Sequence, residues 1–225
     1  MLQSEAANSS VSVIQEANGD FLENDRQISE VQQTLQYDGS SASVYQNAYG
    51  QIGGENRSYI NQDYGYYNSA SVYQVGLDSN ASITQYASVY NGAYITQIGD
   101  TAGGEGDGDD NNATINQYWS GDSSAGIYQD GARNNASIQQ GDSWGSSWSS
   151  WNNAGITQVG FDNTGTIYQT GEGNQAYLVQ LGNANYSSIY QTNVGNYANV
   201  TQSNDGHYSN VTQTGVGGFV SVTQN

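Results

Sequence analysis

The chain has 225 residues, with 21 acidic and three basic side chains, so its formal net charge is −18. This charge argues against binding to nucleic acid or to an anionic membrane through the protein's own field. The chain also lacks Cys and Pro, which excludes a disulfide framework and leaves every strand able to donate hydrogen bonds on both sides.

The first residues are polar, and residues 1–8 are expected to form an N-terminal tail. No secretory signal or membrane-spanning apolar run is visible in this sequence. Residues 9–225 then repeat one five-residue phrase seventeen times: a small residue, any residue, an aliphatic residue, any residue and Gln. A unit this short cannot enclose a core alone, so it must stack on copies of itself.

The early copies are unevenly spaced, and insertions are expected near residues 16–28, 47–50, 100–110 and 141–151. The first contains Phe21 and Leu22 and is predicted to be a cap-like excursion. The third is acidic and rich in glycine. It matches the calcium-binding pattern Gly-Gly-x-Gly-x-Asp only in part, because Gly108 stands where Asp is required. A solvated loop is expected there, with weak calcium binding as the alternative.

The fourth insertion carries three of the four tryptophans of the chain. Trp144, Trp148 and Trp151, separated by small residues, form a possible exposed patch for a surface, a glycan or a neighbouring fibre. The alternative is a loop that folds back and shields one face of the repeats.

In the last third of the chain the repeat is regular, with a Gln every eleven residues from Gln158 to Gln224. The Gln and the residues two and four before it share one face of an extended strand. Each copy therefore predicts a short strand with one apolar face, joined to the next by Gly and Asn turns. Stacked glutamines can each donate to one neighbour and accept from the other.

The predicted core glutamine ladder contains Gln46, Gln62, Gln74, Gln85, Gln97, Gln117, Gln129, Gln140, Gln158, Gln169, Gln180, Gln191, Gln202, Gln213 and Gln224. The predicted core aliphatic residues are Val44, Ile60, Val72, Ile83, Ile95, Ile115, Ile127, Ile138, Ile156, Ile167, Leu178, Ile189, Val200, Val211 and Val222. The predicted corner asparagines are Asn56, Asn68, Asn91, Asn111, Asn134, Asn152, Asn163, Asn174, Asn185 and Asn196.

These patterns predict an all-β fold, a β-solenoid with two strands in each rung of about 22 residues, stacked into a cross-β fibril. An eleven-residue period also fits a helical supercoil, but the many glycines and β-branched residues argue against helices. Seventeen strands leave an odd half-rung. Either the first copy, Val11 to Gln15, separates from the stack, or one early copy is not a strand.

The sequence offers little material for catalysis. Its one histidine, His207, occupies a position where other copies have Asn, and there is no Cys. We therefore expect no enzyme, no catalytic residue, no metal site and no cofactor. Two alternatives remain: a monomeric solenoid that binds ice or a glycan, and a polysaccharide-cleaving β-helix. The outer columns contain no regular Thr lattice for the first, and no groove of clustered charges indicates the second.

The C-terminal copy ends the chain in full repeat register and carries no Pro, Lys or bulge that would block its edge. Val220, Val222 and Gln224 are therefore the predicted polymerisation edge, and the first predicted partner is another copy of the chain, added head to tail.

The pattern Asn-x-Ala-x-Leu/Ile-x-Gln with Gly two residues later, as in Asn174 to Gly182, resembles the curlin repeat of bacterial curli. The resemblance covers residues 9–225. It implies an extracellular functional amyloid on the bacterial surface, active in biofilm matrix, adhesion and surface colonisation. It also implies a nucleator subunit and an outer-membrane secretion pore as partners, without nucleic acid or membrane insertion. The acidity resembles the major subunit, whereas the extra copies, the two larger insertions and the missing Gly-rich N-terminal segment depart from the family.

Overall fold

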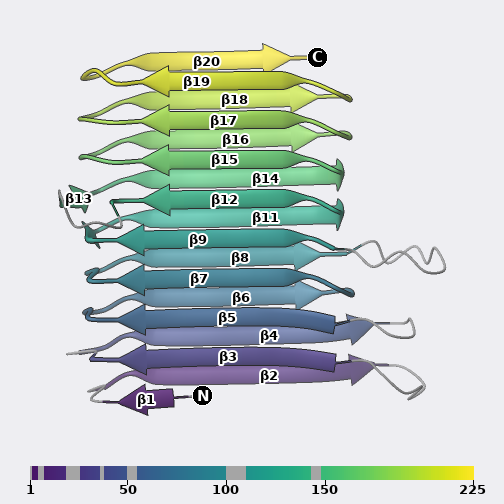
Figure 1. Cartoon of the computed structure of the whole chain (residues 1–225), viewed down its shortest axis with the longest axis vertical. Coiled ribbons are helices and arrows are strands. Elements are labelled where there is room, and N and C mark those ends of the chain that lie inside the picture. Colours follow the sequence, from purple (N-terminus) through teal and green to yellow (C-terminus); the bar gives the residue numbers. More distant parts are fainter. Residues whose placement is uncertain are drawn as a thin grey trace.

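The computed structural model describes residues 2–4, 8–18, 26–35, 38–49, 55–99, 110–142 and 148–225. Within these ranges the chain forms twenty strands and no helix, so no helix that could cross a membrane is found among them. Two nine-stranded parallel sheets face each other, and a two-stranded sheet lies at one edge. Figure 1 shows the strands stacked from the N-terminus to the C-terminus, with successive strands running in opposite directions. The predicted β-solenoid with two strands per rung is confirmed.

The first sheet contains β1 (Leu2–Ser4), β3 (Arg26–Thr34), β5 (Glu55–Asp63), β7 (Asn80–Tyr86), β9 (Asn112–Tyr118), β12 (Asn135–Gln140), β15 (Thr164–Gln169), β17 (Tyr186–Gln191) and β19 (Tyr208–Gln213). The second contains β2 (Ser10–Asn18), β4 (Ser41–Tyr49), β6 (Ser69–Val75), β8 (Gly92–Ile98), β11 (Ser124–Ala132), β14 (Asn153–Phe161), β16 (Gln175–Leu181), β18 (Tyr197–Ser203) and β20 (Phe219–Gln224). The two-stranded sheet pairs β10 (Ser120–Gly121) with β13 (Ser149–Ser150).

The strands stack with like residues on like residues. Between β11 and β14, for example, Ile127 pairs with Ile156 and Gln129 with Gln158. Burial alternates along each interior strand, because every second side chain points between the sheets. The interior is a thin layer of Ala, Val, Ile and Leu, and each fully buried Ile or Leu contributes about 2–3 kcal/mol.

A short strand within the expected N-terminal tail changes the strand count. β1 pairs with β3 and places Gln3 in register with Gln33, as in the later rungs. All seventeen predicted phrases also lie within strands. With β1 each sheet has nine strands, so the described stack consists of whole rungs. Neither explanation offered for an odd half-rung is therefore needed.

The predicted insertions begin and end at different residues from those expected. Residues 47–49 continue β4 and pair with β2, and residues 16–18 and 26–28 also belong to strands. The remaining parts of the first three insertions, residues 19–25, residue 50 and residues 100–109, lie outside the described residues. Of the fourth, β13 is hydrogen-bonded to β10, and residues 143–147 lie outside the described residues.

A third, very short ladder runs through the turns that lead from the first sheet to the second. One residue of each turn forms a β-bridge with the equivalent residue of the next rung. Among the described residues, only β10 and β13 extend this bridge to a strand of two residues. The ladder contains Asp38, Tyr66, Val89, Gly121, Ser150, Glu172 and Val194. Each turn is thereby tied to the turn of the next rung, in addition to the strand pairing.

Candidate functional site

Two ladders of glutamine amides run through the interior, one for each sheet. In the second sheet, Nε2 of Gln129 donates to Oε1 of Gln158 at 2.9 Å, and Nε2 of Gln158 donates to Oε1 of Gln180 at 2.8 Å. The same donation from each glutamine to the next continues along the whole ladder, from Gln15 to Gln224 in the second sheet and from Gln33 to Gln213 in the first. Every step points in the same direction, from the N-terminal rung toward the C-terminal rung.

The second hydrogen of each amide ties the two sheets together. Nε2 of Gln158 in β14 also donates to the backbone carbonyl of Asn135, at the start of β12 in the opposite sheet, at 3.1 Å. The predicted glutamines from Gln46 to Gln202 are fully buried. Burying an amide is unfavourable unless it is hydrogen-bonded, and here both hydrogens and the oxygen are used.

Asparagine side chains form similar columns at the two corners of the prism. Oδ1 of Asn163 accepts the backbone N–H of Asn185 at 3.1 Å, and Nδ2 of Asn185 donates to the carbonyl of Asn204 at 2.8 Å. All ten predicted corner asparagines are buried. The amide thus replaces the backbone partners that the chain lacks where it turns out of a strand.

Both asparagine columns end before the last rung. His207 and Gly218 occupy their final positions, and their backbone N–H groups donate to Asn185 and Asn196. Nε2 of His207 lies 2.8 Å from the carbonyl oxygen of Ser203, four residues earlier, as Nδ2 of Asn196 does from that of Thr192. The last rung therefore has no corner amide to offer to a further rung.

β20 has a strand on only one side among the described residues. In β18, Ala198, Val200 and Gln202 are completely buried, because β16 and β20 lie on either side. In β20 the corresponding Val220, Val222 and Gln224 are only partly buried. Phe219 stacks on Tyr197, so the exposed edge of β20 repeats the side-chain arrangement of the strand below it.

The unfinished ends of the glutamine ladders are chemically complementary. At the C-terminal end, Gln213 and Gln224 each use one amide hydrogen on a backbone carbonyl, and no described acceptor is present for the other. At the N-terminal end, Gln15 donates to Gln46, while its Oε1 accepts no hydrogen bond from the described residues. One end thus presents donors and the other an acceptor.

Charged side chains lie outside the core. Arg133 makes a bidentate ion pair with Asp162, in which Nε donates to Oδ1 at 2.8 Å and Nη2 donates to Oδ2 at 2.9 Å. This hydrogen bonding lowers the pKa of the Asp162 carboxyl. The Asp38 carboxyl accepts from Asn8 at 2.9 Å and from Tyr67 at 2.7 Å, and these two bonds lower its pKa. No group of three or more metal-ligating side chains is found in the described part of the chain.

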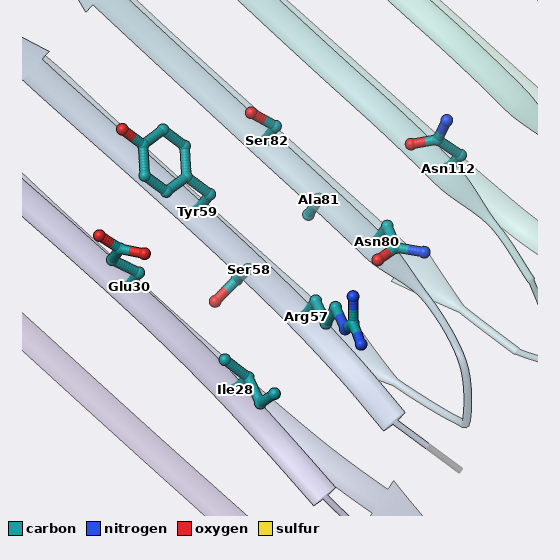
Figure 2. Close-up of a pocket in the computed structure, with 9 residues that line it drawn as sticks. All are labelled: Ile28, Glu30, Arg57, Ser58, Tyr59, Asn80, Ala81, Ser82 and Asn112. Atoms are coloured by element: carbon teal, nitrogen blue, oxygen red, sulfur yellow. The ribbon is translucent and has the colours of Figure 1, made fainter.

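A shallow depression lies on the outer face of the first sheet (Figure 2). It forms where Ser82 on β7 is shorter than the neighbouring side chain of Tyr59 on β5. Arg57, at one end of it, is paired with Glu55 at 2.8 Å. The other lining side chains are small or uncharged apart from Glu30. They provide no pair of groups arranged for acid–base chemistry.

Aromatic residues gather at the turns from the first sheet to the second. Of the predicted patch, Trp148 and Trp151 lie there and are exposed, whereas Trp144 is outside the described residues. The tyrosines that accompany them were not predicted from the sequence. Their spacing in the sequence could have indicated that they share a turn position, because Tyr67 follows Gln62 and Tyr90 follows Gln85 by five residues each.

Comparison with known families matches residues 160–192 to the Curlin associated repeat. The matched segment runs from the end of β14 through β15 and β16 to just beyond β17, which is one and a half rungs of the stack. Residues 160–192 therefore form a curlin repeat. The same phrase and the same burial pattern continue over the other rungs, and the curlin repeat is that of curli-type fibre subunits. No curated protein matches the chain.

Proposed function

We propose that this protein is a structural subunit of an extracellular, curli-like amyloid fibre, which grows by head-to-tail addition of whole molecules. One observation carries the proposal: β20 is an uncovered strand in full register with the stack, and its core-facing residues are partly exposed. A second copy would bury Val220, Val222 and Gln224 under its own β2, as β18 is buried under β20.

The direction of growth follows from the amide ladders. When copies stack head to tail, the donor of Gln224 meets the acceptor of Gln15 in the same sheet of the next molecule, and Gln213 lies over the strand β1 of that molecule. Two C-terminal ends brought together would oppose donor to donor and leave buried amide hydrogens unpaired, at about 1–3 kcal/mol each. The ladders therefore favour one orientation of the incoming molecule.

The wider role is drawn from the curlin repeat. Proteins with this repeat are generally extracellular fibre subunits, so we place the fibres on the bacterial surface, in biofilm matrix, adhesion and surface colonisation. Its partners are further copies of itself, a nucleating subunit and a secretion pore. The excess of acidic residues over basic ones, 21 against three, favours the role of the major subunit.

Seeded elongation tests the docking edge. Val222→Lys places a charge in the core of the new junction, at a cost of several kcal/mol, so growth from preformed seeds should slow by about tenfold or more. Thr223→Lys, one residue away on the outer face, is the matched control and should grow nearly as fast as the wild type. Equal elongation of Val222→Lys and wild-type protein would show that β20 is not the docking strand.

A further inference from the structure

Seven exposed aromatic rings share one edge of the solenoid, the left edge in Figure 1 where β13 lies. They belong to the turns of four consecutive rungs, between β5 and β14. We call this set the aromatic corner; it consists of Tyr64, Tyr66, Tyr67, Tyr90, Trp119, Trp148 and Trp151. The rings follow one another along the stacking direction, and Tyr67 stacks on Tyr90 with ring centres 5.0 Å apart.

Most of these residues adopt an unfavourable backbone conformation. Tyr67, Tyr90 and Trp151 have φ values of 51°, 56° and 55°, in the left-handed region where a non-glycine residue costs about 1–2 kcal/mol. The equivalent positions in the next two rungs are Gly173 and Gly195, with φ values of 66° and 68°. Glycine therefore closes the same turn without this cost, so the fold does not require aromatic residues there.

Packing does not account for the rings. Trp151 remains 64% exposed and has no aromatic neighbour in stacking distance among the described residues. Its indole N–H donates to the Asp122 carboxylate at 3.1 Å, which holds the ring on the surface of the turn. Tyr90 is 56% exposed although it stacks on Tyr67. A row of large, exposed and oriented rings is typical of a binding surface.

Charge limits the class of ligand. Asp122 lies in one of these turns and Asp38 in the turn of the rung before them, hydrogen-bonded to Tyr67. The three basic residues of the chain, Arg26, Arg57 and Arg133, lie at or near the opposite turns. The corner therefore disfavours anionic polymers, and two acidic corners of neighbouring fibres would repel each other. An uncharged ligand with flat apolar faces and hydroxyl donors suits both the rings and the carboxylates.

We propose that the aromatic corner binds an uncharged, extended, β-linked polysaccharide. Tyr67, Tyr90 and Trp151 occupy the same turn position in the first, second and fourth of these rungs, and Asp122 occupies it in the third. Because the rungs are about 4.8 Å apart, close to the rise of one sugar in such a chain, consecutive sugars can lie over consecutive rungs and meet either a ring or the carboxylate. Asp38 and Asp122 accept hydrogen bonds from sugar hydroxyls beside the rings. The site lies on the side of the stack and is present in the single molecule as well as in a fibre.

Binding to microcrystalline cellulose, an insoluble uncharged β-glucan, tests the proposal with the full-length protein. Tyr67, Tyr90 and Trp151 are changed together to Gly, which suits their φ values and removes the rings. The wild type should bind, and the triple variant should bind at least about tenfold more weakly. The matched control changes Tyr73, Tyr94 and Tyr190 to Thr; these tyrosines are exposed on the strand faces, and their loss should leave binding unchanged.

Intrinsic fluorescence provides a reading that does not need a variant. Three of the four tryptophans lie in the aromatic corner, so soluble cellohexaose should shift the emission of the wild type, whereas anionic alginate oligomers should not. Absence of cellulose binding by the wild type, or equal binding by the triple variant, overturns the proposal. Loss of side-by-side fibre bundling in the triple variant without any glycan binding would assign the corner to contacts between filaments instead. Because fibre growth is scored separately, either result leaves the docking role of β20 unaffected.

Discussion

At the scale of single residues, the buried glutamines do what hydrophobic residues cannot. Gln158 accepts from Gln129, donates to Gln180 and donates to the carbonyl of Asn135 in the other sheet. A leucine would fill a similar volume but would leave all three partners unpaired. The glutamine therefore keeps both the register within a sheet and the attachment between sheets.

The first prediction follows from these three hydrogen bonds of Gln158. Gln158→Leu should lower the free energy of unfolding by about 3 kcal/mol or more, since each unpaired buried polar group costs about 1–3 kcal/mol. Gln139→Leu, on the outer face of the neighbouring β12, should change it by less than about 1 kcal/mol. Denaturant unfolding of the two variants measures both values. Similar losses would mean that the ladder contributes no more than surface hydrogen bonds.

A second prediction concerns the Asp38 carboxyl, whose pKa lies below its ordinary value of 3.8 because Asn8 and then Tyr67 donate to it. A lowered pKa in the folded state stabilises the fold above the unfolded pKa, and this contribution is lost as pH falls through the folded pKa. Asn8→Ala should raise the Asp38 pKa toward 3.8, and Tyr67→Phe should raise it by less. Carboxyl carbon NMR titration measures these shifts. An unchanged pKa in both variants would remove these hydrogen bonds as its cause.

At the scale of elements, the turns differ more than the strands, and two kinds of glycine show this. Gly160 lies at the end of β14, where the chain enters the turn, with φ +115°, and an added Cβ would lie 2.2 Å from the carbonyl oxygen of Gly182 in the next rung. Gly195 has φ +68°, and an added Cβ would meet nothing within 4 Å. The first glycine is required by stacking, and the second only by its φ.

The third prediction compares these two glycines. Gly160→Ala should destabilise the fold by about 3 kcal/mol or more, because both the φ and the close contact oppose a side chain. Gly195→Ala should cost only about 1 kcal/mol, as the tyrosines in the same turn position of earlier rungs already suggest. Midpoints of denaturant unfolding distinguish the two. Equal losses of stability would show that the φ angle alone, and not the close approach of the next rung, determines the cost of the added side chain.

Element by element, the strands were predictable and the turns were not. A Gln, an aliphatic residue and a small residue at alternate positions can only line one face of a strand, so every phrase lies in a strand. Turn residues follow no such alternation. Neither the pairing of Ser120 with Ser149 nor the row of aromatic turns could be predicted before the rungs were aligned. Insertions of different lengths separate those turns in the sequence.

At the scale of the whole molecule, the ends were the least predictable part. β1 contributes only three residues, so it shows no full phrase, although Gln3 lies in ladder register. Of the aromatic corner, only Trp148 and Trp151 were predicted from the sequence. Its tyrosines belong to separate repeats and become neighbours only through stacking. Contacts between distant copies depend on alignment across rungs, which local patterns do not contain.

The pairing of β1 also determines the mass per unit length expected of a filament. The nine described strands in each sheet, at about 4.8 Å per strand, give an axial advance of roughly 43 Å for these 225 residues. A single filament should then have a mass per unit length of roughly 0.56 kDa per Å, from 24.0 kDa over that advance. Scanning transmission electron microscopy measures this quantity. A value midway between one and two filaments would mean that adjoining molecules overlap instead of meeting end to end.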